Sequence, residues 1–420
     1  MARQPLPIMR FLTGRNLIMN TVRNFNWRHA VEEAASRWKS PFFLVAWGPV
    51  RAALGELALL ETAVPVRHWL SLKTQPVGKL VRAWQQQGLG VEIVTEYEFR
   101  AAVACGFDAQ SILVNGVAKH VWLSQVKTPG LRVHFDSLHE VEQLAPQARA
   151  LGWRIGLRLD VRGAFDESAS EFQRQFGLSE DEVRKAKSIL DQAGVRIEGL
   201  HFHLKSNLGS VKYYSKALHE LERICRSASL EPQYLDLGGG FPAPGETASG
   251  VNNAAAFDLE ELANMLRDAR AVFPGLAEIW FENGRFMTAR AGALVITVLD
   301  IKERPDSRYL ICDGGRTNHA FVSMWQEHEV LTIPERNGGL RPTTICGSTC
   351  TGFDRLGKQM LPGDIRIGDQ LAWLNAGAYH IPWETRFSHG LAAVIWQDEQ
   401  GRLSLAREAE DFNSWWSQWK

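Results

Sequence analysis

A regular alternation of short apolar runs and longer amphipathic stretches occupies residues 66–282 of this 420-residue chain. Eight of the apolar runs have the length and composition of buried strands. They span residues 66–72, 91–95, 111–115, 131–136, 153–160, 196–203, 233–237 and 277–282. Apolar residues three and four positions apart predict intervening helices over residues 77–87, 97–105, 138–148, 179–193, 213–226 and 259–272. The pattern predicts a closed (β/α)8 barrel, because eight parallel strands close around their own side chains.

The pattern changes after residue 285, where apolar runs follow one another without long helices. These runs span residues 293–301, 309–312, 330–333, 343–346, 370–374, 392–396 and 402–405. They predict a mainly antiparallel, β-barrel-like C-terminal domain, so the fold class is α/β plus all-β. We expect residues 1–47 to form an arm and a strand associated with the β domain, residues 48–285 the barrel, and residues 286–420 the β domain.

Composition excludes several kinds of partner and compartment. The chain has 47 Lys and Arg against 47 Asp and Glu, so no net charge attracts it to nucleic acid or anionic lipid. No stretch approaches the roughly 20 apolar residues of a membrane-spanning helix. Five cysteines, an odd and small number for this length, argue against a disulfide framework and favour the reducing cytoplasm.

Chemically reactive residues stand at the predicted strand ends, where barrels of this kind place their active sites. They are Lys73, Arg158, His201, His203, Gly238, Gly239, Gly240 and Glu282. The three glycines let backbone N–H groups approach a phosphate. A lysine whose pKa is lowered by partial burial can form a Schiff base with a carbonyl group, and Glu282 can hold a ring nitrogen protonated. Together these groups predict a site for pyridoxal 5′-phosphate.

Seven short motifs carry a resemblance to a known family. They lie at residues 71–76 (SLKTQP), 94–98 (VTEYE), 199–206 (GLHFHLKS), 236–242 (DLGGGFP), 282–285 (ENGR), 346–354 (CGSTCTGFD) and 375–379 (NAGAY). In this order they resemble the fold-type III pyridoxal-phosphate enzymes of the ornithine, diaminopimelate and arginine decarboxylase group. The likeness covers residues 41–387, nearly the whole chain. Thr74, Gln75, Lys205 and Asn283 depart from the usual motif residues.

The resemblance implies an amino-acid decarboxylase that needs pyridoxal 5′-phosphate. Lys73 would bind the cofactor covalently, with Glu98 near that bond, His203 stacked on the pyridine ring and Cys350 as proton donor to the substrate Cα. The expected cofactor-binding residues are Lys73, Glu92, Arg158, His203, Ser206, Gly238, Gly239, Gly240, Glu282, Gly284, Arg285 and Tyr379. In this family the cysteine segment completes the active site of the other subunit, so a homodimer with shared active sites is implied.

Departures from the family pattern concern the substrate, which we expect to be an amino acid or amino-acid conjugate, a small molecule. Diaminopimelate decarboxylases carry Cys-Glu-Ser where this chain has Cys350, Thr351 and Gly352, so the glutamate that holds the distal amino group is missing. The remaining candidate substrate contacts are Thr351, Asp354, Arg316 and Glu327. We therefore expect a diamino acid or a conjugated diamino acid, such as a siderophore or other secondary-metabolite precursor, rather than plain diaminopimelate.

Three alternatives to decarboxylation are considered. A racemase could use the same barrel and lysine, although no opposing tyrosine is found beside Cys350. A metal-dependent barrel hydrolase could use His201 and His203, which the strand would place on one face, but it leaves the triple glycine without a role. A binding or regulatory relative would be expected to have lost Lys73 or the glycines. Thus we expect no catalytic metal, and we interpret His134 as a surface or helix-packing residue.

Overall fold

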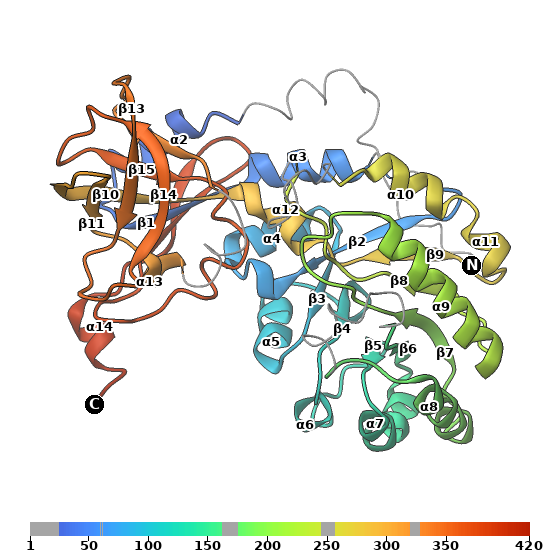
Figure 1. Ribbon diagram of the computed structural model, residues 1–420. Helices are drawn as coiled ribbons and strands as arrows, with labels where there is room; N and C mark the ends of the chain where they lie inside the picture. Colours follow the sequence, from blue (N-terminus) through green and yellow to red (C-terminus); the bar gives the residue numbers. More distant parts are fainter. Residues whose placement is uncertain (1–24, 59, 61, 162–174, 245–256, 320–327) are drawn as a thin grey trace.

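The computed structural model describes residues 25–58, 60, 62–161, 175–244, 257–319 and 328–420. Eight parallel strands close into a barrel in chain order, which confirms the predicted fold. They are β2 (Val66–Ser71), β3 (Gly90–Ile93), β4 (Ile112–Val114), β5 (Arg132–Phe135), β6 (Arg154–Arg158), β7 (Ile197–His201), β8 (Tyr234–Asp236) and β9 (Glu278–Phe281). Figure 1 shows this barrel beside a separate, strongly twisted sheet formed by later parts of the chain.

Helices cover the outside of the barrel (Figure 1). They are α4 (Gly78–Gln86), α5 (Glu96–Ala104), α6 (His120–Leu123), α7 (Leu138–Leu151), α8 (Glu180–Gln192), α9 (Lys212–Ala228), α10 (Leu259–Leu266) and α11 (Ala269–Val272). The helix predicted over residues 259–272 is two helices, and β7 ends at His201 rather than at residue 203. Ser179 and Glu182 form a capping box that fixes the start of α8.

Large aromatic rings fill the barrel interior. Trp69, Leu113, Tyr234 and Trp280 form one buried cluster, with the rings of Tyr234 and Trp280 stacked at 3.7 Å between centroids. Gly199 makes room for them, because a Cβ atom there would lie 2.1 Å from the Tyr234 ring. The interior of the barrel is therefore filled by packed side chains. Any small-molecule chemistry belongs at the mouth formed by the C-terminal strand ends.

The second sheet has nine strands, and most of its neighbouring strands are antiparallel. Its members are β1 (Phe42–Ala46), β10 (Gly292–Glu303), β11 (Arg308–Cys312), β12 (Val330–Ile333), β13 (Leu340–Cys346), β14 (Arg355–Pro362), β15 (Gln370–Trp373), β16 (Ala393–Gln397) and β17 (Leu403–Arg407). The exceptions are the parallel pairs β1–β16 and β11–β13. The first strand of the described residues, β1, thus lies in the middle of a sheet whose other strands come from the last third of the chain.

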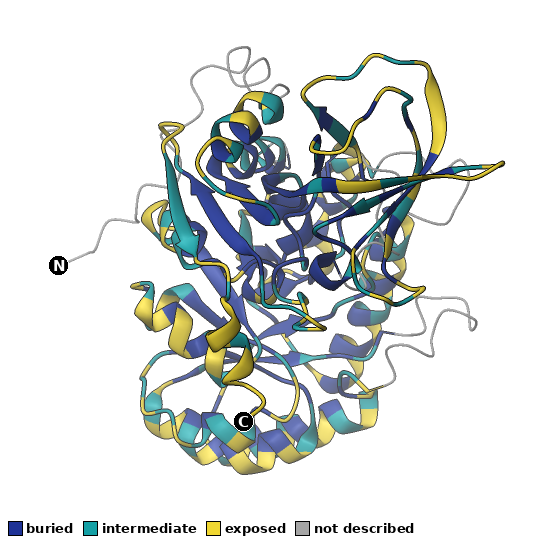
Figure 2. Cartoon of the chain, turned by 90° about the vertical axis from the view of Figure 1, so that its left-hand side faces the viewer, coloured by how far each residue is buried: buried dark blue, intermediate teal, exposed yellow. Residues whose placement is uncertain are grey.

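Two helices connect the sheet to the barrel (Figure 1). Helix α3 (Trp47–Leu57) follows β1 and packs against α12 (Gly284–Thr288), which follows β9. Arg290 and Glu56 form an ion pair at 3.6 Å across this contact. Figure 2 shows buried residues concentrated in the central strands and exposed residues on the outer helices and loops. The remaining short helices are α2 (Trp27–Ala35), α13 (Arg316–His319) and α14 (Phe412–Trp416).

In the part of the chain that the structure describes, no helix is both long and apolar enough to span a membrane.

Candidate active site

Polar side chains from the strands and the loops that follow them meet at the barrel mouth. Lys73 lies in a 3-10 turn (Leu72–Thr74) directly after β2, and Glu92 lies on the neighbouring strand β3. Asn115 follows β4, His203 follows β7, and Glu282 follows β9. Because all eight strands are parallel, their carboxyl ends share one face of the barrel. The closed barrel therefore brings the predicted reactive residues to one face.

Lys73 is paired with a buried carboxylate. Its Nζ atom lies 3.0 and 3.2 Å from the two carboxylate oxygens of Glu92, which also accepts a hydrogen bond from Ser71 Oγ. Glu92 is 1% exposed, whereas the side chain of Lys73 is 42% exposed. Burial lowers the pKa of Lys73, but the carboxylates of Glu92 and Glu282 raise this pKa by more, so the net shift is upward. The expectation of a lowered lysine pKa is therefore wrong for the polypeptide by itself.

Glu282 is the buried acid of the site. Asn115 donates a hydrogen bond from Nδ2 to Oε1 of Glu282, and His201 Nε2 lies 3.4 Å from the same oxygen. Burial raises the pKa of Glu282 well above its usual value, and the nearby carboxylates of Asp236 and Glu92 raise it further. A protonated ring nitrogen would supply the positive charge that this buried carboxylate lacks. The environment of Glu282 therefore fits the pyridine ring of the predicted cofactor.

The glycine loop after β8 has room only for backbone. A Cβ atom on Gly239 would lie 2.4 Å from the carbonyl oxygen of Glu282, and one on Gly240 would lie 2.2 Å from that of Lys205. Gly238 and Gly240 adopt positive φ angles of 69° and 108°. Such a loop offers backbone N–H groups to an anion at close range. It forms a cradle of the kind that binds the phosphate of the cofactor.

Arg285 and Tyr379 lie together although they come from two different parts of the fold. The guanidinium of Arg285 lies 5.0 Å from the centre of the Tyr379 ring. The backbone N–H of Tyr379 donates to the carbonyl oxygen of Thr74 at 2.8 Å, which ties this loop of the β domain to the segment carrying Lys73. Gly284 lies against the same segment, because a Cβ atom there would lie 2.1 Å from Thr74 Oγ1.

His203 and Arg158 lie at the strand ends between the lysine and the glycine loop. Nδ1 of His203 accepts a hydrogen bond from the Gly239 N–H at 3.1 Å. Burial, with the charges of Arg158 and Lys73, lowers the pKa of His203 to about 3, so its ring is neutral near pH 7. Arg158 donates to Asp136 Oδ1 at 3.3 Å. Ser206, further along the same loop, is exposed.

The carboxylate nearest Lys73 is Glu92, and Glu98 has a different set of bonds. Glu98 lies in the first turn of α5 and accepts a hydrogen bond from the Val94 N–H at 2.6 Å. Burial raises its pKa. This bond stabilises the turn between β3 and α5. The turn directly follows the end of β3, where Glu92 lies. The positive charge of Lys73 lowers the pKa of Glu98, but less than burial raises it.

The cysteine segment lies in the β13–β14 connection. Cys350 is exposed, and so is the neighbouring Phe353 at 78%. Asp354 is only 4% exposed, and its carboxylate accepts hydrogen bonds from the backbone N–H groups of Arg316 and Thr349 and from the Thr349 hydroxyl. Asp354 thus organises the loop instead of presenting a free carboxylate to a substrate. Thr351 is half-buried. Glu327 lies outside the described residues.

Two residues of the barrel differ from their predicted roles. His134 was interpreted as a surface or helix-packing residue, but strand alternation points it inward, where its ring lies 4.9 Å from that of His201. Its Nε2 atom lies 3.0 Å from the Tyr234 hydroxyl. Asn115, which contacts Glu282, is the last residue of a predicted strand, and that position alone could have indicated it.

The paired histidines predicted for a hydrolase do not converge. Ligand atoms of His201 cluster with those of His134, Asp236 and Glu282 in the barrel interior. His203 lies beyond the end of β7, beside Gly239. Because β7 ends at His201, the two histidines do not lie on one strand, so the expectation that one strand places both on one face is wrong.

A lysine, a buried acid and a phosphate cradle at the mouth of a (β/α)8 barrel define the site of a barrel-type pyridoxal-phosphate enzyme. Comparison with known proteins agrees. The family model described as "Pyridoxal-dependent decarboxylase, pyridoxal binding domain" matches residues 57–289. The chain belongs to this family, so it is a decarboxylase that uses pyridoxal 5′-phosphate.

Individual relatives are distant but cover most of the chain. The chain is 27% identical over 406 residues to a diaminopimelate decarboxylase of Actinosynnema pretiosum subsp. auranticum, covering 90% of this chain and 89% of that protein. It is 28% identical over 374 residues to the L-glutamyl-[BtrI acyl-carrier protein] decarboxylase of Niallia circulans, covering 82% and 85%. The structure of diaminopimelate decarboxylase from Helicobacter pylori complexed with L-lysine has a TM-score of 0.78 at 20% identity, covering 92% and 98%.

Proposed function

We propose that the chain removes the α-carboxylate of an amino acid whose distal group is conjugated and carries no free ammonium. Bound pyridoxal phosphate supplies the electron sink for the carbanion formed at Cα. Lys73 is the covalent attachment point, and Glu282 holds the ring nitrogen protonated. Gly238, Gly239, Gly240, Ser206, Arg285 and Tyr379 bind the phosphate. His203 stacks on the ring, and Cys350 returns a proton to Cα.

The observation that carries the substrate proposal is the chemistry of the cysteine segment. From Thr349 to Phe353 no residue is acidic, and the carboxylate of Asp354 is buried and already bonded. The guanidinium of Arg316 lies 3.5 Å from the carbonyl oxygen of Phe353 in this segment. Among the described residues, this segment offers a free distal ammonium no unbonded carboxylate. The relative from Niallia circulans, named for a conjugated glutamyl substrate, agrees with this preference.

A panel of substrates tests this preference. We expect CO2 release from N-acylated diamino acids to have a kcat/KM at least about tenfold above that of free ornithine, lysine or diaminopimelate, a difference of about 1.4 kcal/mol. A siderophore-type precursor with an acylated diaminopropionyl group belongs in the panel. Activity confined to the free diamino acids would contradict the proposal.

Thr351 provides a matched pair of variants for the same panel. Thr351→Glu restores a carboxylate beside Cys350 and is expected to shift kcat/KM toward free diamino acids. Thr351→Gln has nearly the same size without the charge, so it controls for steric effects. An equal shift in both variants would show that charge at this position does not select the substrate.

We further propose a homodimer in which Cys350 of one subunit serves the site of the other. Its exposure, together with that of Phe353, supports an intersubunit role. Cys350→Ala should lower the rate about 10²- to 10⁴-fold as the loss of a general acid. Mixing inactive Lys73→Ala and Cys350→Ala chains should restore about one quarter of wild-type activity, because half of the dimers are mixed and each contains one intact site. A mixture with no more activity than its components would contradict the shared site.

We also propose the bounds of the domains and the cellular compartment of the enzyme. We assign residues 1–47 to the arm and first strand, 48–285 to the barrel and 286–420 to the β domain, supported by the pairing of β1 with β10 and β16. We also assign the enzyme to the cytoplasm, supported by five cysteines that are all free thiols.

A further inference from the structure

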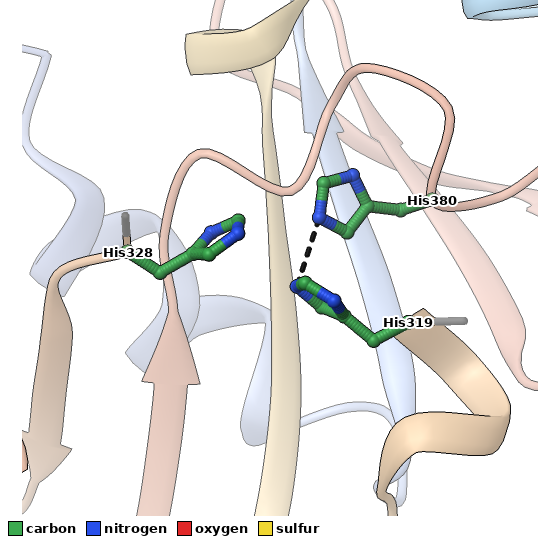
Figure 3. A group of neighbouring side chains, drawn as sticks. All are labelled: His319, His328 and His380. Carbon is green, nitrogen blue, oxygen red and sulfur yellow. Dashed lines mark hydrogen bonds between the residues drawn. The ribbon is translucent and has the colours of Figure 1, made fainter. Parts of the chain in front are cut away.

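Three buried histidines meet in the sheet domain, away from the barrel interior. His319 is the last residue of α13, His328 lies just before β12, and His380 lies in the loop after β15. One nitrogen of each ring lies within 4.8 Å of a nitrogen of each of the others. Figure 3 shows the three rings directed toward a common centre from three separate segments.

Backbone carbonyls determine which nitrogen carries the proton in two of the rings. Nδ1 of His380 lies 2.8 Å from the carbonyl oxygen of Ala378, and Nδ1 of His328 lies 2.6 Å from that of Leu374. A carbonyl oxygen can only accept a hydrogen bond, so both Nδ1 atoms are protonated. In the neutral rings, the lone pair is therefore on Nε2, the atom available to a ligand. This second-sphere pattern is common in metal-binding histidines.

The Nε2 lone pairs of His328 and His380 then have no hydrogen-bond donor among the described residues. Nε2 of His380 lies 2.9 Å from Nε2 of His319, which already accepts the indole N–H of Trp373 at 2.6 Å. Nε2 of His328 is buried and has no hydrogen-bond partner in the described part of the chain. No placement of protons on three neutral rings satisfies these contacts together. An added proton is disfavoured, since burial lowers the pKa of His328 to about 4 and that of His380 well below its usual value.

We propose that His319, His328 and His380 bind a divalent transition-metal ion, with zinc as the favoured ion. Nε2 of His328, Nε2 of His380 and one nitrogen of His319 would be the ligands, and water would complete the coordination. Zinc lies about 2.0–2.1 Å from imidazole nitrogens, which places tetrahedral ligand atoms about 3.3 Å apart. With Nε2 of His319 as a ligand, the 2.9 Å contact would widen by a few tenths of an ångström, and the indole N–H of Trp373 would no longer bond to that nitrogen. All the ligand atoms already lie within 4.8 Å of one another. Neutral imidazoles with Nδ1 held by carbonyls are ready to coordinate without losing a proton.

The position of the cluster indicates a structural role. His380 follows Tyr379, whose ring lies over Arg285 in the phosphate cradle. An ion bound by the three histidines would tie the end of α13 and the start of β12 to the loop that carries Tyr379. No metal was expected at the catalytic centre, and this cluster is a separate site. The proposal is independent of which amino acid the enzyme decarboxylates.

Metal content of the holoenzyme tests the proposal. Full-length protein loaded with pyridoxal phosphate and freed of any histidine tag is dialysed against zinc chloride and then against metal-free buffer. We expect about one zinc ion per chain by elemental analysis, and an anomalous-scattering peak between the three rings in crystals. Cobalt substitution should give visible ligand-field bands of imidazole coordination. Zinc far below one ion per chain, or a peak elsewhere, would overturn the proposal.

Two variants and one control locate the ion. His328→Gln and His380→Gln are each expected to weaken zinc binding on the order of 100-fold or more. His219→Gln, which removes an exposed histidine from α9, should bind zinc like the wild type. Retention of one tightly bound zinc in both cluster variants would place the ion elsewhere and overturn the assignment. If these variants do not fold, the wild-type stoichiometry and anomalous peak still decide the question.

Discussion

Replacing Lys73 with alanine is expected to abolish decarboxylation, with a loss of at least about 10³-fold in kcat. Lys73 lies at the end of β2, faces the mouth of the barrel, and is the only lysine among the motif residues that meet Glu92 and Glu282 there. Borohydride reduction of the wild-type holoenzyme should leave a pyridoxyl adduct on residue 73, detected by peptide mass spectrometry. The Lys73→Ala protein should carry no adduct and should lose its visible cofactor absorbance on dialysis.

The alanine variant also leaves Glu92 without its cationic partner, so its loss of activity could come from misfolding. Lys73→Arg separates the two effects, because arginine supplies a positive charge to Glu92 and forms no such adduct. Lys127→Ala, at an exposed position on the barrel surface, should behave as the wild type. An active Lys73→Arg enzyme, or an adduct on another lysine in the wild type, would refute the assignment of Lys73.

Replacing Glu282 with glutamine is expected to lower kcat about 10²- to 10⁴-fold while the protein stays folded. Glutamine has nearly the same shape and can still accept the hydrogen bond from Asn115 through its amide oxygen. It cannot hold a ring nitrogen in the protonated form, so the carbanion at Cα loses its stabilisation. The expected result is an enzyme that retains bound cofactor by absorbance but releases CO2 slowly.

Glu278 provides a matched control on the same strand. Glu278 lies at the opposite end of β9, where its partly buried carboxylate pairs with Arg67 at 3.1 Å and accepts the indole N–H of Trp280 at 2.7 Å. Glu278→Gln should leave kcat unchanged within about twofold, because the glutamine oxygen can still accept hydrogen bonds at this end of the strand. Wild-type turnover in Glu282→Gln would show that this carboxylate does not control the ring nitrogen.

The spacing of apolar residues predicted the barrel well, because each of its strands and helices buries one regularly spaced set of side chains. Apolar alternation and helical spacing located all eight strands, and most predicted helix ends lie within a few residues of the observed ones. The exceptions depend on tertiary packing: the helix predicted over 259–272 is divided, and β7 stops at His201. Strand-end position predicted Lys73 and Glu282, since the closed barrel brings every strand end to one face.

The barrel, the family and the residues available at the strand ends could be predicted from residue patterns, because they depend on local periodicity and on contiguous motifs. Which of these groups come into contact became clear from the folded structure. It brought Glu92 to Lys73 while Glu98 bonds to its own turn, and it buried the carboxylate of Asp354. It also gathered His319, His328 and His380 from three segments of the chain. Contacts between distant segments depend on how sheets and helices pack, which no local pattern encodes.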